Sequence, residues 1–197
     1  DEDLRADRQP EFTQIDVEMS FVDCDDVMAT GEGFLAKLFD EVMGIKIDLP
    51  IQRIPYSEAM ENYGSDKPDL RFDLKLKNIT DVAKSIDFTV FAGAIEAGGS
   101  VRAIVIPGGA SFSRKEIDAL TEVCKTYRAK GMAWLVCSET PRGSFLKFLT
   151  PANIADIQEA TGASSDDLIC IVADRNKVVF DSLGALRIEA AKKLSLI

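Results

Sequence analysis

Residues 11–21 read Glu-Phe-Thr-Gln-Ile-Asp-Val-Glu-Met-Ser-Phe, a stretch in which apolar and polar side chains alternate. Successive side chains of an extended strand point to opposite faces, so the pattern predicts a strand with one apolar face. The alternate residues of that face are Ile15, Val17, Met19 and Phe21. The opposite face carries Gln14, Asp16, Glu18 and Ser20. Most polar strand faces are simply solvated, but this row also suits a small ligand that carries an ammonium group.

The composition is that of an ordinary globular protein, since 46% of the 197 residues are apolar. This length allows one large domain or two small ones. No apolar run is long enough to cross a bilayer, and the acidic start lacks the features of a signal peptide, so a cytoplasmic location without membrane contact is predicted. Because the first residue is not Met, we expect a piece of a longer protein.

Charge and side-chain chemistry narrow the possible functions. The formal net charge of −10 argues against nucleic-acid binding through overall charge, although Arg5 and Arg8 in the first loop leave a local basic contact open. Histidine, the commonest general base and metal ligand, is absent from the chain. No Cys-x-x-Cys pair occurs, so no metal site is predicted. Cys124, Cys137 and Cys170 lie in apolar segments and are expected to be buried.

Helix and strand signals alternate along the chain. Capping residues and glycines predict four long helices. These are delimited by Asp23 and Gly44, by Ser113 and Gly131, by Thr150 and Gly162, and by Asp174 and Lys193. Apolar residues 88–95 and 101–106, separated by a Gly-Gly turn, predict a hairpin. With further strands over 132–137 and 168–173, the order of elements predicts an α+β domain on a mostly antiparallel sheet.

Several strings resemble a known family. Residues 1–18, which begin Asp-Glu-Asp-Leu-Arg-Ala-Asp-Arg-Gln-Pro, resemble motif 2 of the bacterial-type aspartyl-tRNA synthetases, which are class II enzymes. Residues 63–71, Tyr-Gly-Ser-Asp-Lys-Pro-Asp-Leu-Arg, resemble a second hallmark of this family. Shorter strings resemble the GAD domain that these enzymes carry between motifs 2 and 3. They are found at residues 90–93, 107–111, 130–134 and 184–187.

The resemblance implies a division of the α+β chain into three parts. Residues 1–79 are expected to belong to a class II catalytic domain, of which they supply the motif 2 loop and strand and the following helices. Residues 80–175 are expected to form a GAD-type insertion domain on a mostly antiparallel sheet. Residues 176–197 are expected to form a helix that returns toward the catalytic domain.

The implied activity is that of an aspartate–tRNA ligase. Such an enzyme activates L-aspartate with ATP to aspartyl-adenylate and transfers the aspartyl group to the 3′ end of tRNA(Asp). The resemblance implies ATP and Mg²⁺ as cofactors of the parent protein, which is expected to be a cytoplasmic homodimer. The Arg that opens motif 2, together with motif 1, motif 3 and the anticodon-binding barrel, is missing from these 197 residues. We therefore expect a fragment with no complete catalytic site, no cofactor of its own and no activity alone.

The resemblance also assigns roles to individual residues. Glu2 and Gln9 correspond to ATP contacts, and Gln14 and Asp16 correspond to the pocket for substrate aspartate. Asp16 is suited to bind the α-ammonium group through a charge-assisted hydrogen bond. The resemblance also implies contacts with phosphates and other parts of the tRNA acceptor end. The residues expected to make these contacts are Glu2, Arg5 and Arg8.

Two alternatives remain open at this stage. The chain could be a GAD-type tRNA-positioning module of a tRNA-dependent amidotransferase, but such a subunit has no reason to carry the motif 2-like residues 1–21. The parent could also be a non-discriminating synthetase that charges both aspartate and asparagine tRNAs. Residues that read the anticodon would decide the second question, and the fragment lacks them.

Overall fold

The computed structural model describes residues 9–197, and the chain divides into two compact units at Arg53, so that the described part of the first unit is residues 9–53 and the second unit is Ile54–Ile197. Within this part of the chain, no helix combines the length and the apolarity needed to cross a lipid bilayer. The second unit has a hydrophobic core, whereas residues 9–53 of the first unit contribute no buried side chain.

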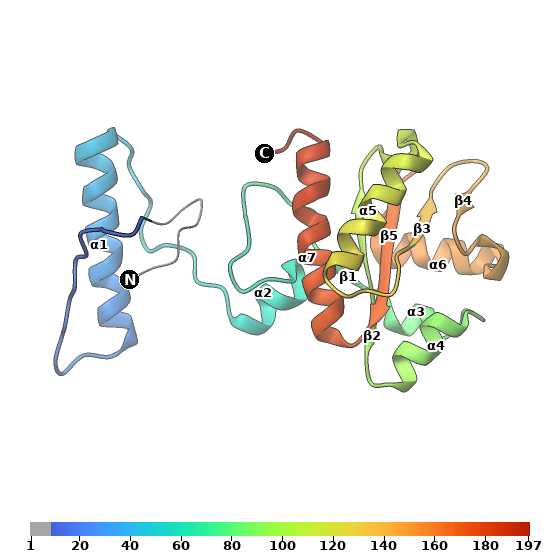
Figure 1. The fold of residues 1–197 in the computed structure, drawn as a ribbon, viewed down its shortest axis with the longest axis horizontal. Helices are drawn as coiled ribbons and strands as arrows, with labels where there is room; N and C mark the ends of the chain where they lie inside the picture. The colour runs from blue at the N-terminus through green and yellow to red at the C-terminus, as the bar shows by residue number, and fades with distance from the viewer. Residues whose placement is uncertain (1–8) are drawn as a thin grey trace. The chain divides into compact units, whose positions relative to one another are not determined.

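The second unit is built on a five-stranded sheet in the order β1-β2-β5-β3-β4, and every pair of neighbours is antiparallel (Figure 1). The strands are β1 (Lys77–Asn78), β2 (Ser100–Ile106), β3 (Ala133–Val136), β4 (Arg142–Gly143) and β5 (Leu168–Asp174). Strand β5 lies in the middle, where Cys170 pairs with Ile104 of β2 on one side and with Trp134 of β3 on the other. The antiparallel α+β architecture predicted from the sequence is therefore confirmed.

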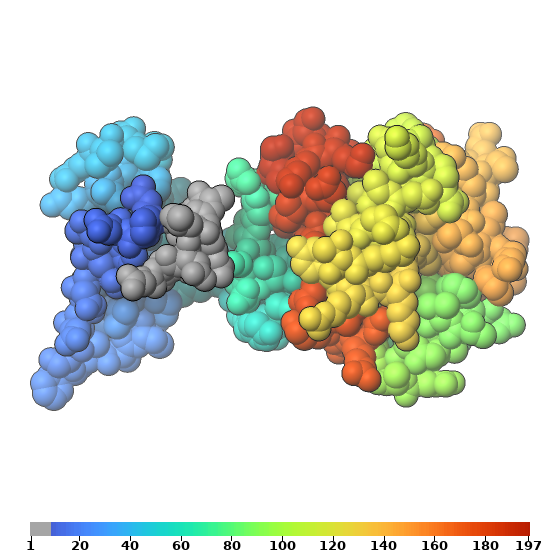
Figure 2. All heavy atoms as spheres, viewed as in Figure 1, coloured from blue at the N-terminus to red at the C-terminus, as the bar shows by residue number. Residues whose placement is uncertain are grey.

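Helices cover both faces of this sheet (Figure 1). On one face lie α5 (Arg114–Thr126) and α7 (Asn176–Lys193), which also pack against each other and are seen side by side in Figure 2. On the other lie α3 (Thr80–Ala83), α4 (Thr89–Glu96) and α6 (Pro151–Thr161). Since successive β5 side chains point to opposite faces, the strand supplies both cores and none of residues 168–172 is exposed.

Several sequence predictions agree with these elements. Asp23 with Asp26, Ser113 with Glu116, and Thr150 with Asn153 form capping boxes at helix starts. Gly44 and Gly162 end their helices in the left-handed conformation. The predicted burial of three cysteines is confirmed as well, and burial raises the pKa of the Cys124 thiol to about 12. A thiol in that state is unreactive at neutral pH.

The predicted hairpin over residues 88–106 is wrong in its first half. Residues 89–96 form the helix α4, and only the second half forms a strand, β2. The run 88–95 is apolar apart from Thr89, so by pattern it fits a buried strand and a buried helix equally well. Its centre, Ala92-Gly93-Ala94, lacks the β-branched side chains that favour strands, and Phe91 anchors the helix among Phe88 and Phe145.

Two helix ends differ from prediction. Helix α5 ends at Thr126 rather than at Gly131, because Arg128 takes a left-handed conformation with φ of 76°. Asp174 is not the N-cap of α7, a position that Arg175 occupies without a side-chain cap. Asp174 is instead the last residue of β5, paired with Ser100 of β2, so sheet pairing fixes its backbone in the extended form.

In the first unit, α1 (Cys24–Met43) is the regular element among the described residues, and the strand predicted over the alternating segment is not formed. A strand is stabilised by hydrogen bonds to a neighbouring strand, and residues 9–53 contain none. Phe21 also interrupts the alternation, since its φ is 60°. The alternating pattern therefore predicts which side chains are apolar and which are polar, but it does not supply the neighbouring strand that a β-strand needs.

Helix α2 (Tyr56–Tyr63) joins the sheet unit through a close approach of two glycines. A Cβ built on Gly184 of α7 would lie 2.7 Å from the carbonyl oxygen of Gly64, and one built on Gly64 would lie 2.4 Å from that of Phe180. Gly64 also has a positive φ of 67°, which ends α2. The two glycines are therefore required by contact as well as by conformation.

The segment that follows Gly64 is held by a buried arginine. Arg187, which is only 1% exposed, donates hydrogen bonds of 2.7 Å to the carbonyl oxygens of Phe72 and Asp73. Its guanidinium carbon lies 4.0 Å from the centre of the Phe72 ring and 4.9 Å from that of Tyr63. Burial lowers the pKa of the Arg187 guanidinium, and nearby acidic groups oppose that shift. Carbonyl dipoles and ring faces thus take the place of water around this cation.

Replacing Gly184 by Ala should destabilise the second unit by about 1–3 kcal/mol, because the added methyl group meets backbone atoms that cannot move aside. Trp134, the single tryptophan of the chain, reports this unit in urea unfolding followed by fluorescence. Gly93→Ala in α4 is the matched control. Its methyl group would meet no atom within 4 Å, so no loss of stability is expected there.

Replacing Arg187 by Met should loosen residues 65–75, because it leaves two inward-facing carbonyl oxygens without their donor. The cost should be about 1–3 kcal/mol. Hydrogen exchange followed by mass spectrometry should show that residues 65–75 exchange faster in the variant than in the wild type. The exchange rate of β5 should be the same in both proteins. Lys192→Met, at an exposed position of the same helix, should leave the pattern unchanged. Equal exchange of residues 65–75 in the Arg187 variant and the wild type would contradict the anchoring role.

Candidate functional site

The residues predicted to bind aspartate lie on an exposed segment of irregular backbone. Gln14 and Asp16 are both solvent-accessible, and so is Gln9, the predicted ATP contact. Gln14 and Asp16 lie close to each other because they are two residues apart in the chain. Both are exposed, so the described residues do not enclose them in a pocket. Three more predicted contacts, Glu2, Arg5 and Arg8, lie outside the described residues.

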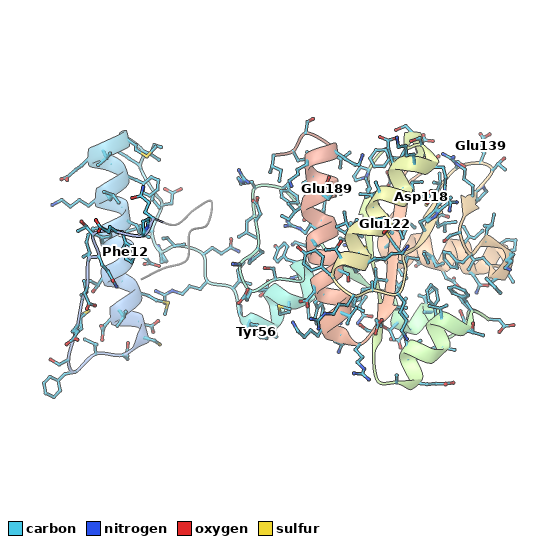
Figure 3. The ribbon with its side chains drawn as sticks, viewed as in Figure 1. Phe12, Tyr56, Asp118, Glu122, Glu139 and Glu189 are labelled. Carbon is cyan, nitrogen blue, oxygen red and sulfur yellow. The ribbon has the colours of Figure 1, made fainter. Side chains whose placement is uncertain are left out.

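The apolar side of the same segment is uncovered. Ile15 is 72% exposed and Val17 is 65% exposed, and Phe12, labelled in Figure 3, is similarly open. Helix α1 shares this property, since its apolar side chains Phe34 and Leu38 are exposed. Residues 9–53 contain no buried side chain at all, so the described part of the first unit has two apolar surfaces and no core.

Polar contacts nevertheless fix the end of the first unit to α1. Arg53 lies 2.7 Å from a carboxylate oxygen of Asp25 and 3.7 Å from one of Glu32. Glu32 also accepts a hydrogen bond from the backbone N–H of Ile51. These contacts hold residues 51–53 beside the helix although apolar packing is absent there. The order of this link is therefore electrostatic, and we expect it to weaken with added salt.

The loop over residues 65–71 has an anchored base and a polar, accessible tip. The Arg187 contacts hold residues 72 and 73, and the tip exposes Asp66 and Lys67. Arg71 donates two parallel hydrogen bonds to Asp69, with N–O distances of 3.0 and 2.6 Å, and these bonds lower the pKa of the Asp69 carboxyl to about 2. The pair is thus ionised throughout the physiological range. Accessible polar groups on a rigid base are typical of binding loops.

A second buried arginine lies between α2 and the sheet, and sequence reasoning missed it. Arg102 of β2 is 4% exposed, donates to both carboxylate oxygens of Glu61 and lies 4.7 Å from the centre of the Phe180 ring. The apolar neighbours Val101 and Ala103 are typical of an ordinary buried strand. The sequence around Arg102 therefore does not indicate that it pairs with Glu61, which lies 41 residues earlier. The bidentate geometry fits a structural clamp.

The exposed carboxylates of α5 form ion pairs with neighbouring basic side chains. Asp118 and Glu122, labelled on α5 in Figure 3, have partners one turn away in Arg114 and Lys125. Among residues 9–197, no group of three or more His, Cys, Asp or Glu side chains is arranged to hold a metal ion.

The second unit also contains a cavity of about 580 Å³ between α4 and the sheet, lined by none of the predicted site residues. Two strings that carry the family resemblance, residues 90–93 and 130–134, contribute to its wall. Sequence patterns do not predict this cavity, because they predict a strand where α4 lies.

Comparison with known proteins gives a consistent relationship. The family model described as tRNA synthetases class II (D, K and N) matches residues 1–180. An aspartate–tRNA ligase of Ruminiclostridium cellulolyticum is 54% identical over the whole chain, which covers 34% of that protein. One from Clostridium botulinum strain Eklund 17B is 56% identical, and the chain covers 33% of it.

The chain therefore spans about a third of the length of the curated relatives it matches. The family match includes the motif 2-like segment and the second unit as far as residue 180, so it does not rest on one short string. By this match, the chain belongs to the class II tRNA synthetases (D, K and N), and it is homologous to part of an aspartate–tRNA ligase.

Proposed function

We propose that the chain is the part of an aspartate–tRNA ligase that contributes a motif 2 segment to the aminoacylation site and carries the GAD-type insertion domain. The observation that carries this proposal is the identity of 54–56% to aspartate–tRNA ligases along the entire chain. In the parent protein, L-aspartate, ATP and tRNA(Asp) are the substrates, Mg²⁺ assists the ATP step, and two copies form a cytoplasmic dimer.

The match over residues 1–180 favours a synthetase over an amidotransferase subunit, because it includes the motif 2-like residues. In this proposal residues 1–79 and 176–197 flank an insertion domain of residues 80–175. The sheet unit of the structure extends further than that domain, since β1 and α7 both pack within it. The flanks would then support the insertion domain as well as connect it.

The uncovered apolar surfaces of the first unit support its role as part of a larger domain. Exposed apolar side chains line both the segment of Ile15 and Val17 and the helix of Phe34 and Leu38. In the parent, which is about three times as long, strands of the catalytic sheet would cover these surfaces and pair with residues 12–19. Gln14 and Asp16 would then project together into the amino-acid pocket.

Within that pocket, Asp16 binds the α-ammonium group of aspartate and Gln14 donates to or accepts from the substrate as an amide can. Adenylation requires the carboxylate of aspartate to be held in line with the α-phosphate of ATP. Fixing the ammonium group orients the substrate for this attack, and no histidine base is needed. Glu2 and Gln9 contact the nucleotide, while Arg5 and Arg8 hold phosphates of the tRNA acceptor end.

Asp16→Ala in the full-length synthetase should reduce kcat/KM for aspartate by about 30- to 1,000-fold in ATP–pyrophosphate exchange. Loss of a buried charge-assisted contact costs about 2–4 kcal/mol, which gives this range. Glu139→Ala, which removes an exposed acid of the second unit, is the matched control and should have no effect. If the Asp16 variant catalyses ATP–pyrophosphate exchange as well as the wild type does, Asp16 does not bind the α-ammonium group of aspartate.

Arg5→Ala and Arg8→Ala should raise KM for tRNA in aminoacylation and leave ATP–pyrophosphate exchange without tRNA unchanged. Each lost phosphate contact should also reduce the slope of log affinity against log salt by about one. Lys115→Ala, at an exposed position of α5, is the control for a change in net charge alone. A loss of exchange activity in either loop variant would instead assign that arginine to the nucleotide.

A further inference from the structure

The cavity beside α4 has a wall with an unusual composition. One side is the helix face of Val90, Gly93, Ala94 and Ala97, whose spacing places them on one side of the helix. Bulky side chains from the start of α4 and from the facing strand and loop segments complete the lining. These are Phe88, Phe91, Met132, Phe145 and Ile171.

The small residues of α4 make a hollow and not a tight contact. A Cβ built on Gly93 would meet no atom within 4 Å, and the same holds for Gly131, so both exposed glycines border the open side of the cavity. At Gly64 and Gly184, by contrast, an added Cβ would collide with backbone. Small side chains thus serve close packing in one place and leave open space in the other. A volume of about 580 Å³ lies within the range of roughly 300–1,000 Å³ found for small-molecule sites.

Two cations lie at the rim of this hollow. Lys130 precedes β3 and Arg175 follows β5, and both side chains are exposed and form no ion pair with another residue in the 9–197 range. The one acid at the rim, Asp174, accepts a hydrogen bond from the backbone N–H of Arg175. In a chain whose formal net charge is −10, this rim carries a local excess of one positive charge. Positive charge next to an apolar cavity favours an anion with an apolar body.

We propose that this cavity binds a small amphiphilic anion. The ligand's ring or hydrocarbon body fills the space between α4 and the wall of Met132 and Phe145, and its carboxylate or phosphate group faces Lys130 and Arg175. Burial of the apolar body supplies most of the affinity, and the two cations supply the preference for an anion. The site lies within the second unit and does not rest on the function proposed above.

Methyl NMR of the chain labelled at methionine tests this proposal, with 1-naphthoate as probe and 1-naphthalenemethanol as its neutral counterpart. Of the five methionines, Met132 lines the cavity and the others do not. Its methyl signal should shift saturably while the remaining four stay in place. The anion should bind about fivefold more tightly than the alcohol, and Lys130→Ala/Arg175→Ala should remove this difference.

Gly93→Leu fills the hollow and should abolish binding of both probes. Ala92→Leu, on an exposed position of the same helix outside the cavity wall, is the control and should bind as the wild type does. Trp134 fluorescence verifies that each variant is folded. An unmoved Met132 signal at millimolar 1-naphthoate, equal affinity for the two probes, or a preference that persists in the double-alanine variant would each overturn the proposal.

Discussion

The second unit depends on the burial of both faces of β5. This strand pairs with β2 and β3, and its side chains alternate between the core under α5 and α7 and the core under α4 and α6. A central antiparallel strand of this kind cannot shift by one residue, because every side chain would exchange cores. Its register therefore fixes where α4, Lys130 and Arg175 lie around the cavity, and where α7 presents Arg187 to the loop.

Buried arginines connect the parts that the sheet does not reach. Arg187 ties residues 72 and 73 to α7, and Arg102 ties α2 to β2 through Glu61. Both guanidinium groups also lie over aromatic rings. Backbone carbonyls and a carboxylate satisfy these cations, so their burial does not leave an unpaired charge. The result is a polar loop, residues 65–71, whose base is fixed while its tip stays accessible.

The two units differ in how they achieve order. The second has a continuous core, whereas the described part of the first has capped helix ends and ion pairs but no buried side chain. Apolar faces without a partner are expected where a segment belongs to a larger fold, and the relatives are about three times as long. The proposed aspartate pocket falls in this first unit. Gln14 and Asp16 are therefore exposed here, and the described residues do not enclose them in a pocket.

The sequence by itself determined the family, the antiparallel α+β architecture and the helix ends at Asp23, Ser113 and Thr150. These features depend on local patterns, because a cap bonds to residues only three positions away. Only the tertiary structure decided that residues 89–96 form a helix, that residues 12–19 form no strand, and that Arg187 meets Phe72. The helix and the Arg187 contact depend on residues far away in the chain, and the missing strand reflects the lack of a neighbouring strand within residues 9–53. Neither periodicity nor capping carries information about such partners.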